Sequence, residues 1–394
     1  MRLAWLSPLP PMRSGIADYS ADLLPFLAER ATVDAVAPLR DRPAEVPVGA
    51  GFVDAHAFRS RRGEYERVLC HIGNSPMNEF AYVAAVRDRS VMVLHDLTLH
   101  HLFADAFLSR GDRDGYEALL RLLYGTAGDR LIDLQRRGLG TEYDRFLFPM
   151  IEHVPGKASA VVVHSLAGAR CVEGVAPEVP VTVIPHHAGV EPPEVAGIDR
   201  AAARASLRLP RDAFVVAHLG FLVPAKQPAT VLRAFARLAE RRPDALLLIV
   251  GQDAPTRSLG RALDRYPHRD RVRMTGYVDL ADFYRALRAA DAVVNLRFPT
   301  LGESSGSFAR ALAVGRATIV NNAGSFADVP ADATLRVELD EDQVEAVAAH
   351  LLRLADDDAL RERVETAARA YAAEELDPAR CAARYVEAAA ASAA

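Results

Sequence analysis

One loop in the second half of the chain combines residue types that could bind a phosphorylated sugar. The apolar run 291–296 predicts a buried parallel strand, and the run 307–314, closed by Gly315, predicts a helix. Between them the loop offers Arg297, Glu303 and a Ser-Ser-Gly turn. Backbone N–H groups and the positive end of a helix dipole at such a place suit a phosphate. Because the Glu303 carboxylate can also accept hydrogen bonds from sugar hydroxyls, the loop favours a nucleotide-sugar over a bare nucleotide.

Residues that could do related chemistry follow other predicted strands. Open α/β folds bind ligands outside the carboxyl ends of their strands, so such residues gather along one edge of a sheet. For each of them a purely structural role, as a turn, a helix cap or a satisfied buried group, is the competing interpretation. The candidates are Gly15, Asp18, Asn74, His95 and Asp96 in the first half of the chain, and Lys226, Gly251, Tyr277 and Val278 in the second.

Short apolar runs alternate with helical periodicity along most of the chain, which predicts βαβ units and parallel sheets. A chain of 394 residues is long enough for two domains of roughly 180 residues each. We place a first domain at 1–190, a Pro- and Glu-rich linker at 189–197 and a second domain at 198–375. A helical insertion is expected at about 100–153, and a helix at about 376–394 is expected to pack back on the first domain.

The individual elements follow from the same patterns. Two similar α/β halves joined at the linker predict a cleft that faces the carboxyl ends of both sheets. Predicted strands are 3–6, 32–36, 67–70, 91–94, 160–163 and 181–184, then 214–218, 245–250, 271–274, 292–296 and 317–320. Predicted helices of the first half are 17–30, 78–87, 100–137 (interrupted at Gly111 and Gly125), 141–153 and 166–173.

Composition excludes several classes of protein. Hydrophobic residues make up 50% of the chain and charged residues 25%, which is typical of a globular protein. A net charge of −5 provides no electrostatic footprint for nucleic acid. The three cysteines are widely spaced and lack zinc-binding spacing, so we expect a reduced, cytoplasmic protein. We expect no signal peptide and no membrane span, and the sequence leaves a peripheral contact with the inner membrane face open.

Several motifs together resemble a known family. They are Leu69-Cys-His-Ile-Gly-Asn-Ser-Pro76, Val93-Leu-His-Asp96 and Asn295-Leu-Arg-Phe-Pro-Thr-Leu-Gly-Glu-Ser-Ser-Gly306. With the segment 7–19 after the first strand, they resemble the family-4 retaining glycosyltransferases of the GT-B architecture, in particular a bacterial subgroup that often acts in polysaccharide assembly. The resemblance implies two Rossmann-like parallel-sheet domains that face each other across a cleft. It also implies a nucleoside-diphosphate sugar as co-substrate, a hydroxyl-bearing acceptor, and neither a cofactor nor a bound metal.

The resemblance assigns roles to the candidates. Lys226 would pair with the diphosphate leaving group, Glu303 would meet the donor sugar, and His95 would position that sugar near its reacting carbon. The donor would further contact Gly15, Arg297, Gly251, Tyr277 and Val278 and the turn Ser304, Ser305, Gly306 and Ser307. Asp18, Asn74 and Asp96 are the acceptor-side candidates.

The chain departs from the family pattern in two places. Phe221 stands where the family has an arginine in its diphosphate-binding loop, and we expect Arg297 to supply the missing charge. The second acid of the family's E-x7-E motif, which contacts ribose, is absent, because Arg310 and Ala311 occupy the candidate positions. These departures leave a catalytically impaired binding or scaffold protein as the alternative function. A dehydrogenase is disfavoured because residues 7–19 lack the G-x-G-x-x-G pattern.

Overall fold

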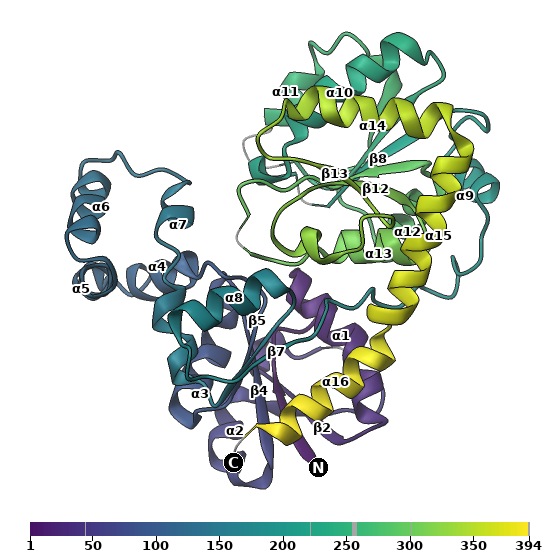
Figure 1. Cartoon of the computed structure of the whole chain (residues 1–394). Helices are drawn as coiled ribbons and strands as arrows, with labels where there is room; N and C mark the ends of the chain where they lie inside the picture. The colour runs from purple at the N-terminus through teal and green to yellow at the C-terminus, as the bar shows by residue number, and fades with distance from the viewer. Residues whose placement is uncertain (44, 221, 254–257, 301, 393–394) are drawn as a thin grey trace. The chain divides into compact units, whose positions relative to one another are not determined.

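Two parallel β-sheets, each covered by helices on both faces, organise the chain (Figure 1). The computed structural model describes residues 1–43, 45–220, 222–253, 258–300 and 302–392. Its contacts divide the chain into two compact units. The first unit comprises Met1–His187, Leu301–Ser304 and Pro378–Ala394, and the second comprises Ala188–Thr300 and Ser305–Asp377.

The sheet of the first unit contains seven strands in the order β3-β2-β1-β4-β5-β6-β7, all parallel. Side chains of β1 alternate between two cores, with Leu3 and Trp5 on one face and Ala4 and Leu6 on the other. This burial on both faces explains why the strands were predicted as continuous apolar runs. The strands are β1 (Arg2–Leu6), β2 (Thr32–Ala37), β3 (Gly51–Asp54), β4 (Arg67–Ile72), β5 (Val91–Leu94), β6 (Ala160–Val163) and β7 (Val181–Val183).

The helices of the first unit include an insertion between β5 and β6, whose α5 and α6 extend beyond the sheet (Figure 1). Gly111 and Gly125, both with positive φ, separate its helices where interruptions were predicted. The predicted helix over 141–153 is wrong for most of its length, since Pro149 and the left-handed Met150 follow a single helical turn. The helices are α1 (Gly15–Ala28), α2 (Ala55–Arg61), α3 (Glu79–Asp88), α4 (His100–Leu108), α5 (Arg113–Tyr124), α6 (Thr126–Arg136), α7 (Asp144–Leu147) and α8 (Leu166–Val175).

The helix α16 (Pro378–Ala391), at the far end of the sequence, belongs to the first unit. It packs against α1, where the hydroxyls of Tyr385 and Tyr19 lie 2.9 Å apart. Arg67 of β4 donates to the carbonyl of Ala389, 2.8 Å away. The first unit therefore contains both the beginning and the end of the described chain.

The sheet of the second unit contains six parallel strands in the order β10-β9-β8-β11-β12-β13. The strands are β8 (Val215–Leu219), β9 (Leu246–Val250), β10 (Val272–Met274), β11 (Ala292–Val294), β12 (Ala317–Asn321) and β13 (Leu335–Val337). The helices are α9 (Arg200–Ser206), α10 (Pro228–Arg241), α11 (Ser258–Leu263), α12 (Leu280–Ala289), α13 (Gly306–Val314), α14 (Gln343–Asp356) and α15 (Asp358–Glu375). This is the doubly wound arrangement predicted from the sequence.

In both sheets the strands are parallel, but the order in which successive strands are added reverses beside the first strand of the unit. The reversal lies between β1 and β4 in the first sheet and between β8 and β11 in the second. Loops after these four strands diverge, and the crevice that they leave is where doubly wound folds bind ligands. The candidate residues Gly15, Asn74, Lys226 and Arg297 all follow one of these four strands.

The predicted linker is held to the second unit by specific contacts. Glu191 forms a two-bond ion pair with Arg288 of α12, at 2.6 and 2.7 Å. Just before the linker, the backbone N–H of Ala188 donates to the carbonyl of Leu376, also in the second unit, at 2.8 Å. Within the described part of the chain, no helix is both long and apolar enough to span a membrane.

Candidate functional site

Lys226 lies at the reversal point of the second sheet, in a short 3-10 turn after β8. Its Nζ donates to the carbonyl of Leu219 at 3.0 Å, and the residue is only 8% exposed. A Cβ atom on Gly220 would lie 2.2 Å from this Nζ, and Gly220 has a φ of +98°. Glycine at position 220 therefore leaves the space through which the ammonium group reaches the end of the strand.

Gly251 holds the neighbouring loop close to Gly220. Its φ is +143°, and a Cβ atom there would lie 2.0 Å from the Gly220 carbonyl oxygen. The two loops are joined by hydrogen bonds from the N–H of Gly220 to the carbonyl of Val250, and from Leu222 to Gln252, at 2.8 and 3.0 Å. Glycine is therefore required at position 251 for the close packing of the two backbones. The contact of Gly251 with the donor stays a prediction.

Arg297 lies on a loop that contacts the Lys226 turn. The N–H of Phe298 donates to the carbonyl of Ala225 at 2.8 Å, and the N–H of Arg297 donates to Asn321 Oδ1 at 2.7 Å. Burial lowers the pKa of the nearby His218 to about 4, against the raising effect of the Val294 carbonyl, and the Lys226 and Arg297 charges lower this pKa further. Lys226 and Arg297 are thus both close enough to His218 to affect its charge. Phe221, where the family has an arginine, lies outside the described residues.

The predicted serine turn forms the start of α13. Ser305 is the N-cap, and its Oγ accepts the N–H of Phe308 at 3.3 Å. Ser307 Oγ donates to Asn295 Oδ1 at 3.2 Å, and the two serine hydroxyls are 3.0 Å apart. Because these hydroxyls contact each other and Asn295, the predicted phosphate cradle rests on the backbone N–H groups of the first helical turn, beginning with Gly306.

Glu303 and Ser304 come just before this cap. Glu303 is partly exposed, and its stretch of chain, Leu301–Ser304, is grouped with the first unit. Ser304 Oγ is buried and has no hydrogen-bond partner among the described residues. Of the two positions where a second acid could stand, Ala311 is completely buried in the core and Arg310 is partly exposed. A carboxylate at position 311 would therefore be buried in the core. Burying an unpaired charge has a large cost in free energy, so the second acid cannot stand at this position of α13.

The residues predicted to contact the base differ in exposure. Tyr277 is 55% exposed, whereas Val278 packs against the core of the second unit. Asp279 caps α12 by accepting the N–H of Asp282 at 2.8 Å. Since the side chain of Val278 is used in the core, Tyr277 is the better placed of the two to cover a base.

In the first unit, Gly15 is the first residue of α1, after the N-cap Ser14. No described heavy atom lies within 4 Å of the place where a Cβ of Gly15 would be, so packing does not require glycine here. Asp18 lies exposed in the first turn of the same helix. An open glycine beside a helix N-terminus is compatible with the close approach of a ligand.

Asn74 has a structural role that competes with its predicted acceptor contact. Its Oδ1 accepts the N–H groups of His101 and Leu102, at 2.8 and 3.3 Å, at the start of α4. Its own N–H donates to Asp96 Oδ2 at 2.7 Å. Asn74 is thus a cap for α4, and the predicted contact with an acceptor rests on its Nδ2 group alone. His100, near the start of the same helix, has both ring nitrogens within hydrogen-bond distance of protein groups, the Tyr116 hydroxyl and the Phe148 carbonyl.

His95 is the middle member of a buried row of three imidazoles. His71 Nδ1 lies 2.8 Å from His95 Nε2, and His95 Nδ1 lies 3.2 Å from His164 Nε2. His164 Nδ1 lies 2.8 Å from the carbonyl oxygen of Ile184. Both ring nitrogens of His95 are therefore engaged by protein groups, and the residue is 8% exposed. His71 and His164 were not predicted; the available signal was a histidine at the carboxyl end of three consecutive strands, β4, β5 and β6.

The buried histidines make stability depend on pH. Burial lowers the pKa of His164 to about 4, opposed by its bond to the Ile184 carbonyl. The unfolded chain then binds the proton more tightly than the folded chain. The contribution of neutral His164 to the free energy of unfolding is therefore fully present above about pH 6.5 and is lost as pH falls towards 4. We expect His164 to contribute about 3 kcal/mol to this loss. Urea unfolding at pH 7 and pH 4.5 should show a smaller pH difference for His164→Gln than for the unchanged chain; an equal difference would contradict this role.

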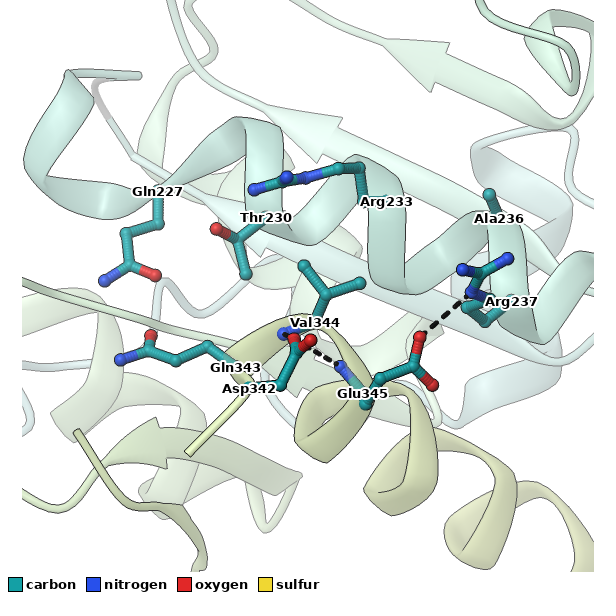
Figure 2. Close-up of a pocket in the computed structure, with 9 residues that line it drawn as sticks. All are labelled: Gln227, Thr230, Arg233, Ala236, Arg237, Asp342, Gln343, Val344 and Glu345. Carbon is teal, nitrogen blue, oxygen red and sulfur yellow. Dashed lines mark hydrogen bonds and ion pairs between the residues drawn. The ribbon is translucent and has the colours of Figure 1, made fainter. Parts of the chain in front are cut away.

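A surface groove of about 500 Å³ runs between α10 and α14 (Figure 2). Arg237 and Glu345 pair across it at 3.1 Å. No predicted site residue lines the groove, but Gln343 in its wall accepts from Asn321 Nδ2 at 3.1 Å. Asn321 thus links the groove to the Arg297 loop. The lining residues are Gln227, Thr230, Arg233, Ala236, Arg237, Asp342, Gln343, Val344 and Glu345.

The two doubly wound units define a GT-B-like fold. The chain superimposes on sucrose-phosphate synthase from Thermosynechococcus elongatus with a TM-score of 0.68 and 17% identity, covering 98% of each chain. The Anabaena protein Alr3699/HepE, solved in complex with UDP and glucose, gives a TM-score of 0.66 and 15% identity, covering 98% of this chain and 99% of that one. These likenesses confirm the predicted fold.

The second unit is similar to a known family. Residues 199–371, less than half of the 394-residue chain, match the family described as Glycosyl transferases group 1. It is 34% identical over 165 residues to the lipopolysaccharide core biosynthesis glycosyltransferase LpsD of Rhizobium meliloti, covering 41% of this chain and 45% of LpsD. It is 30% identical over 237 residues to the phosphatidyl-myo-inositol mannosyltransferase of Mycobacterium tuberculosis, covering 58% of each. The chain thus spans about half the length of these curated relatives.

Proposed function

We propose that this protein is a retaining glycosyltransferase that moves a sugar from a nucleoside-diphosphate sugar to a hydroxyl acceptor. The observation that supports this best is that the loops of Lys226 and Arg297 meet at the reversal point of the second sheet, where the N–H of Phe298 donates to the Ala225 carbonyl at 2.8 Å. The connection that carries Arg297 leads on to the N-terminus of α13. Two cations and a helix N-terminus are the groups that bind a diphosphate. A UDP-sugar is the first donor to test, since the similarly folded HepE was solved with UDP and glucose.

The proposed mechanism uses these groups on the leaving phosphate. As the bond between the anomeric carbon and the phosphate oxygen breaks, negative charge grows on the diphosphate, where Lys226, Arg297 and the helix N-terminus stabilise it. The acceptor oxygen bonds to the anomeric carbon on the same face. The departing phosphate oxygen takes the proton of the acceptor hydroxyl, so configuration is retained without a covalent enzyme intermediate. We expect the reaction to need no metal.

The first unit is proposed to serve the sugar and the acceptor. Gly15 offers an open backbone approach, and His95 provides a fixed ring beside the end of β5. Asp18, Asp96 and Nδ2 of Asn74 are the candidate contacts for acceptor hydroxyls. The relatives act in lipopolysaccharide core synthesis and on phosphatidyl-myo-inositol. We therefore propose a bacterial saccharide, glycolipid or glycosylated metabolite as product, made in the cytoplasm or at the inner membrane face.

A panel of nucleotide-sugars tests the proposed class of donor. UDP-, GDP-, ADP- and dTDP-sugars are each added to the purified chain, and the unfolding midpoint is measured. Binding to the folded state alone raises the midpoint in proportion to the logarithm of ligand concentration. One base should stabilise the chain and Lys226→Ala should abolish the shift. Stabilisation by none of the four, or equal stabilisation by inorganic phosphate, would contradict the proposal.

A binding or scaffold protein is the second candidate. The observation that favours it is the complete burial of Ala311, which removes one position for a ribose-binding acid. Slow hydrolysis of the bound donor separates the two candidates. A transferase releases the nucleoside diphosphate from its own donor, whereas a scaffold binds the donor and leaves it intact.

A further inference from the structure

The row of histidines in the first unit has only one neutral arrangement of protons. The Ile184 carbonyl can only accept, so His164 carries its proton on Nδ1 and presents Nε2 as an acceptor. His95 must then donate from Nδ1 to His164, which leaves His95 Nε2 as an acceptor. His71 in turn must donate from Nδ1 to His95 Nε2. All three rings are therefore Nδ1–H tautomers.

The far end of the row reinforces this direction. His71 Nε2 is buried and has no hydrogen-bond partner among the described residues. If the row reversed, this nitrogen would carry a buried N–H without an acceptor, and His164 would lose its donor to Ile184. Each change leaves a buried polar group unsatisfied, which is more costly than the present arrangement. Both ends of the row therefore favour the same direction.

The surroundings keep the row uncharged. The Trp5 ring centroid is 4.1 Å from that of His71, and the Tyr19 ring stands edge-on to His95 at 5.0 Å. Burial lowers the pKa of both His71 and His95, and the other imidazoles lower the pKa values further. The titratable groups packed around the row are Tyr19 of α1, Tyr385 and Cys381 of α16, His186 and His187 after β7, and Asp96, whose Oδ2 accepts the Asn74 N–H.

We propose that His71 and His164 are positioning residues that hold the His95 imidazole neutral, with its proton on Nδ1 and its Nε2 occupied. In this arrangement His95 serves sugar transfer as a rigid, oriented group and does not carry a proton in the reaction. This inference rests on the proposed function, because that function places the sugar donor near His95. It adds two residues to the machinery of the first unit, each acting through one ring nitrogen of His95.

Amide substitutions test the two contacts separately. At position 164 the useful atom is the acceptor Nε2, which glutamine reproduces and asparagine does not. At position 71 the useful atom is the donor Nδ1, which asparagine reproduces and glutamine does not. We expect kcat of His164→Gln and His71→Asn to stay within about threefold of the unchanged chain. His164→Asn and His71→Gln should lose roughly tenfold or more in kcat with little change in donor KM.

A purely structural role predicts a different ranking. If the rings only fill space, the same amide should be tolerated better at both positions, and that result would overturn the proposal, as would four variants of equal activity. His350→Ala is the control for loss of a histidine ring that contacts a carbonyl, because the half-buried His350 of the second unit lies 2.9 Å from the carbonyl oxygen of Arg336. Its kcat should match that of the unchanged chain.

Histidine tautomers provide a readout that does not need turnover. With 15N- and 13C-labelled histidine at pH 7, NMR should show His71, His95 and His164 as neutral Nδ1–H rings. The His95 signals should keep this form in His164→Gln and His71→Asn and become a tautomer mixture in the other two variants. An Nε2–H or a charged His95 would overturn the inference even in an active enzyme. Absence of turnover with intact Nδ1–H signals would instead count against the proposed function.

Discussion

Replacing Lys226 by alanine should lower kcat/KM for the sugar donor by about 10²–10³-fold. The ammonium group is held at the end of β8 by the Leu219 carbonyl and lies with Arg297 at the place where the diphosphate is proposed to leave. A buried cation of this kind stabilises the growing negative charge of the leaving group, so its loss raises the barrier to transfer. Steady-state release of nucleoside diphosphate, measured over a range of donor concentrations, gives the change in kcat/KM.

The chain provides a natural control for this experiment. Lys157 is the only other lysine in the sequence, and it lies in the first unit, where its Nζ is 2.7 Å from His153 Nε2. Lys157→Ala should leave kcat/KM within about twofold. Lys226→Arg should remain strongly impaired, because the planar guanidinium does not fit where Nζ already excludes a Cβ on Gly220. Full activity of Lys226→Ala would show that the diphosphate does not bind at this place.

Gly251→Ala should destabilise the second unit by about 2–4 kcal/mol and weaken donor binding with it. The added methyl would lie 2.0 Å from the carbonyl oxygen of Gly220, and the backbone has a φ of +143° that alanine disfavours. The atoms that the methyl would meet belong to the backbone of Gly220, so no side chain can rotate to relieve the clash. The loop after β9 would have to move, and with it the glycine that makes room for Lys226. Urea unfolding measures the change in the free energy of unfolding.

Two further glycines separate the causes of this loss. Gly276 also has a positive φ, +76°, but no atom lies within 4 Å of its Cβ position, so Gly276→Ala should cost only about 1 kcal/mol of backbone strain. Gly174, within α8, has open space and an ordinary backbone, so Gly174→Ala should be neutral or stabilise the helix by about 0.5–1 kcal/mol. Equal losses in the free energy of unfolding for Gly251→Ala and Gly276→Ala would contradict the close approach of the Gly251 loop to the backbone of Gly220.

The central strands of both sheets could be predicted because they are buried on both faces. Strands such as β5 and β9 read as unbroken apolar runs, and their predicted bounds agree with the structure to within one residue. Two edge strands, β3 and β13, were missed. Only Val53 of β3 is buried, and β13 has three residues, so neither produces a periodic signal. Their pairing depends on neighbouring strands that are distant in sequence.

The candidate site was only partly predictable for a similar reason. Strand order decides which loops meet, and the loops of Lys226 and Arg297 follow the neighbouring strands β8 and β11 and are hydrogen-bonded to each other. Their contact with a donor stays a prediction. Sequence alone could not show that Asn74 Oδ1 caps α4, because its partners lie 27 and 28 residues away. It also could not show that both nitrogens of His95 are occupied, since the partners come from β4 and from the end of β6.

Donor turnover by the unmodified chain tests the central claim most directly. The nucleotide-sugar that stabilises the chain is incubated with it, and release of the nucleoside diphosphate and of the sugar is followed with time, in parallel with Lys226→Ala. We predict steady release by the unmodified chain that falls by about 10²-fold or more in the variant. No release from a donor that binds, or equal release by the variant, would contradict catalysis by the cations at the reversal point of the second sheet.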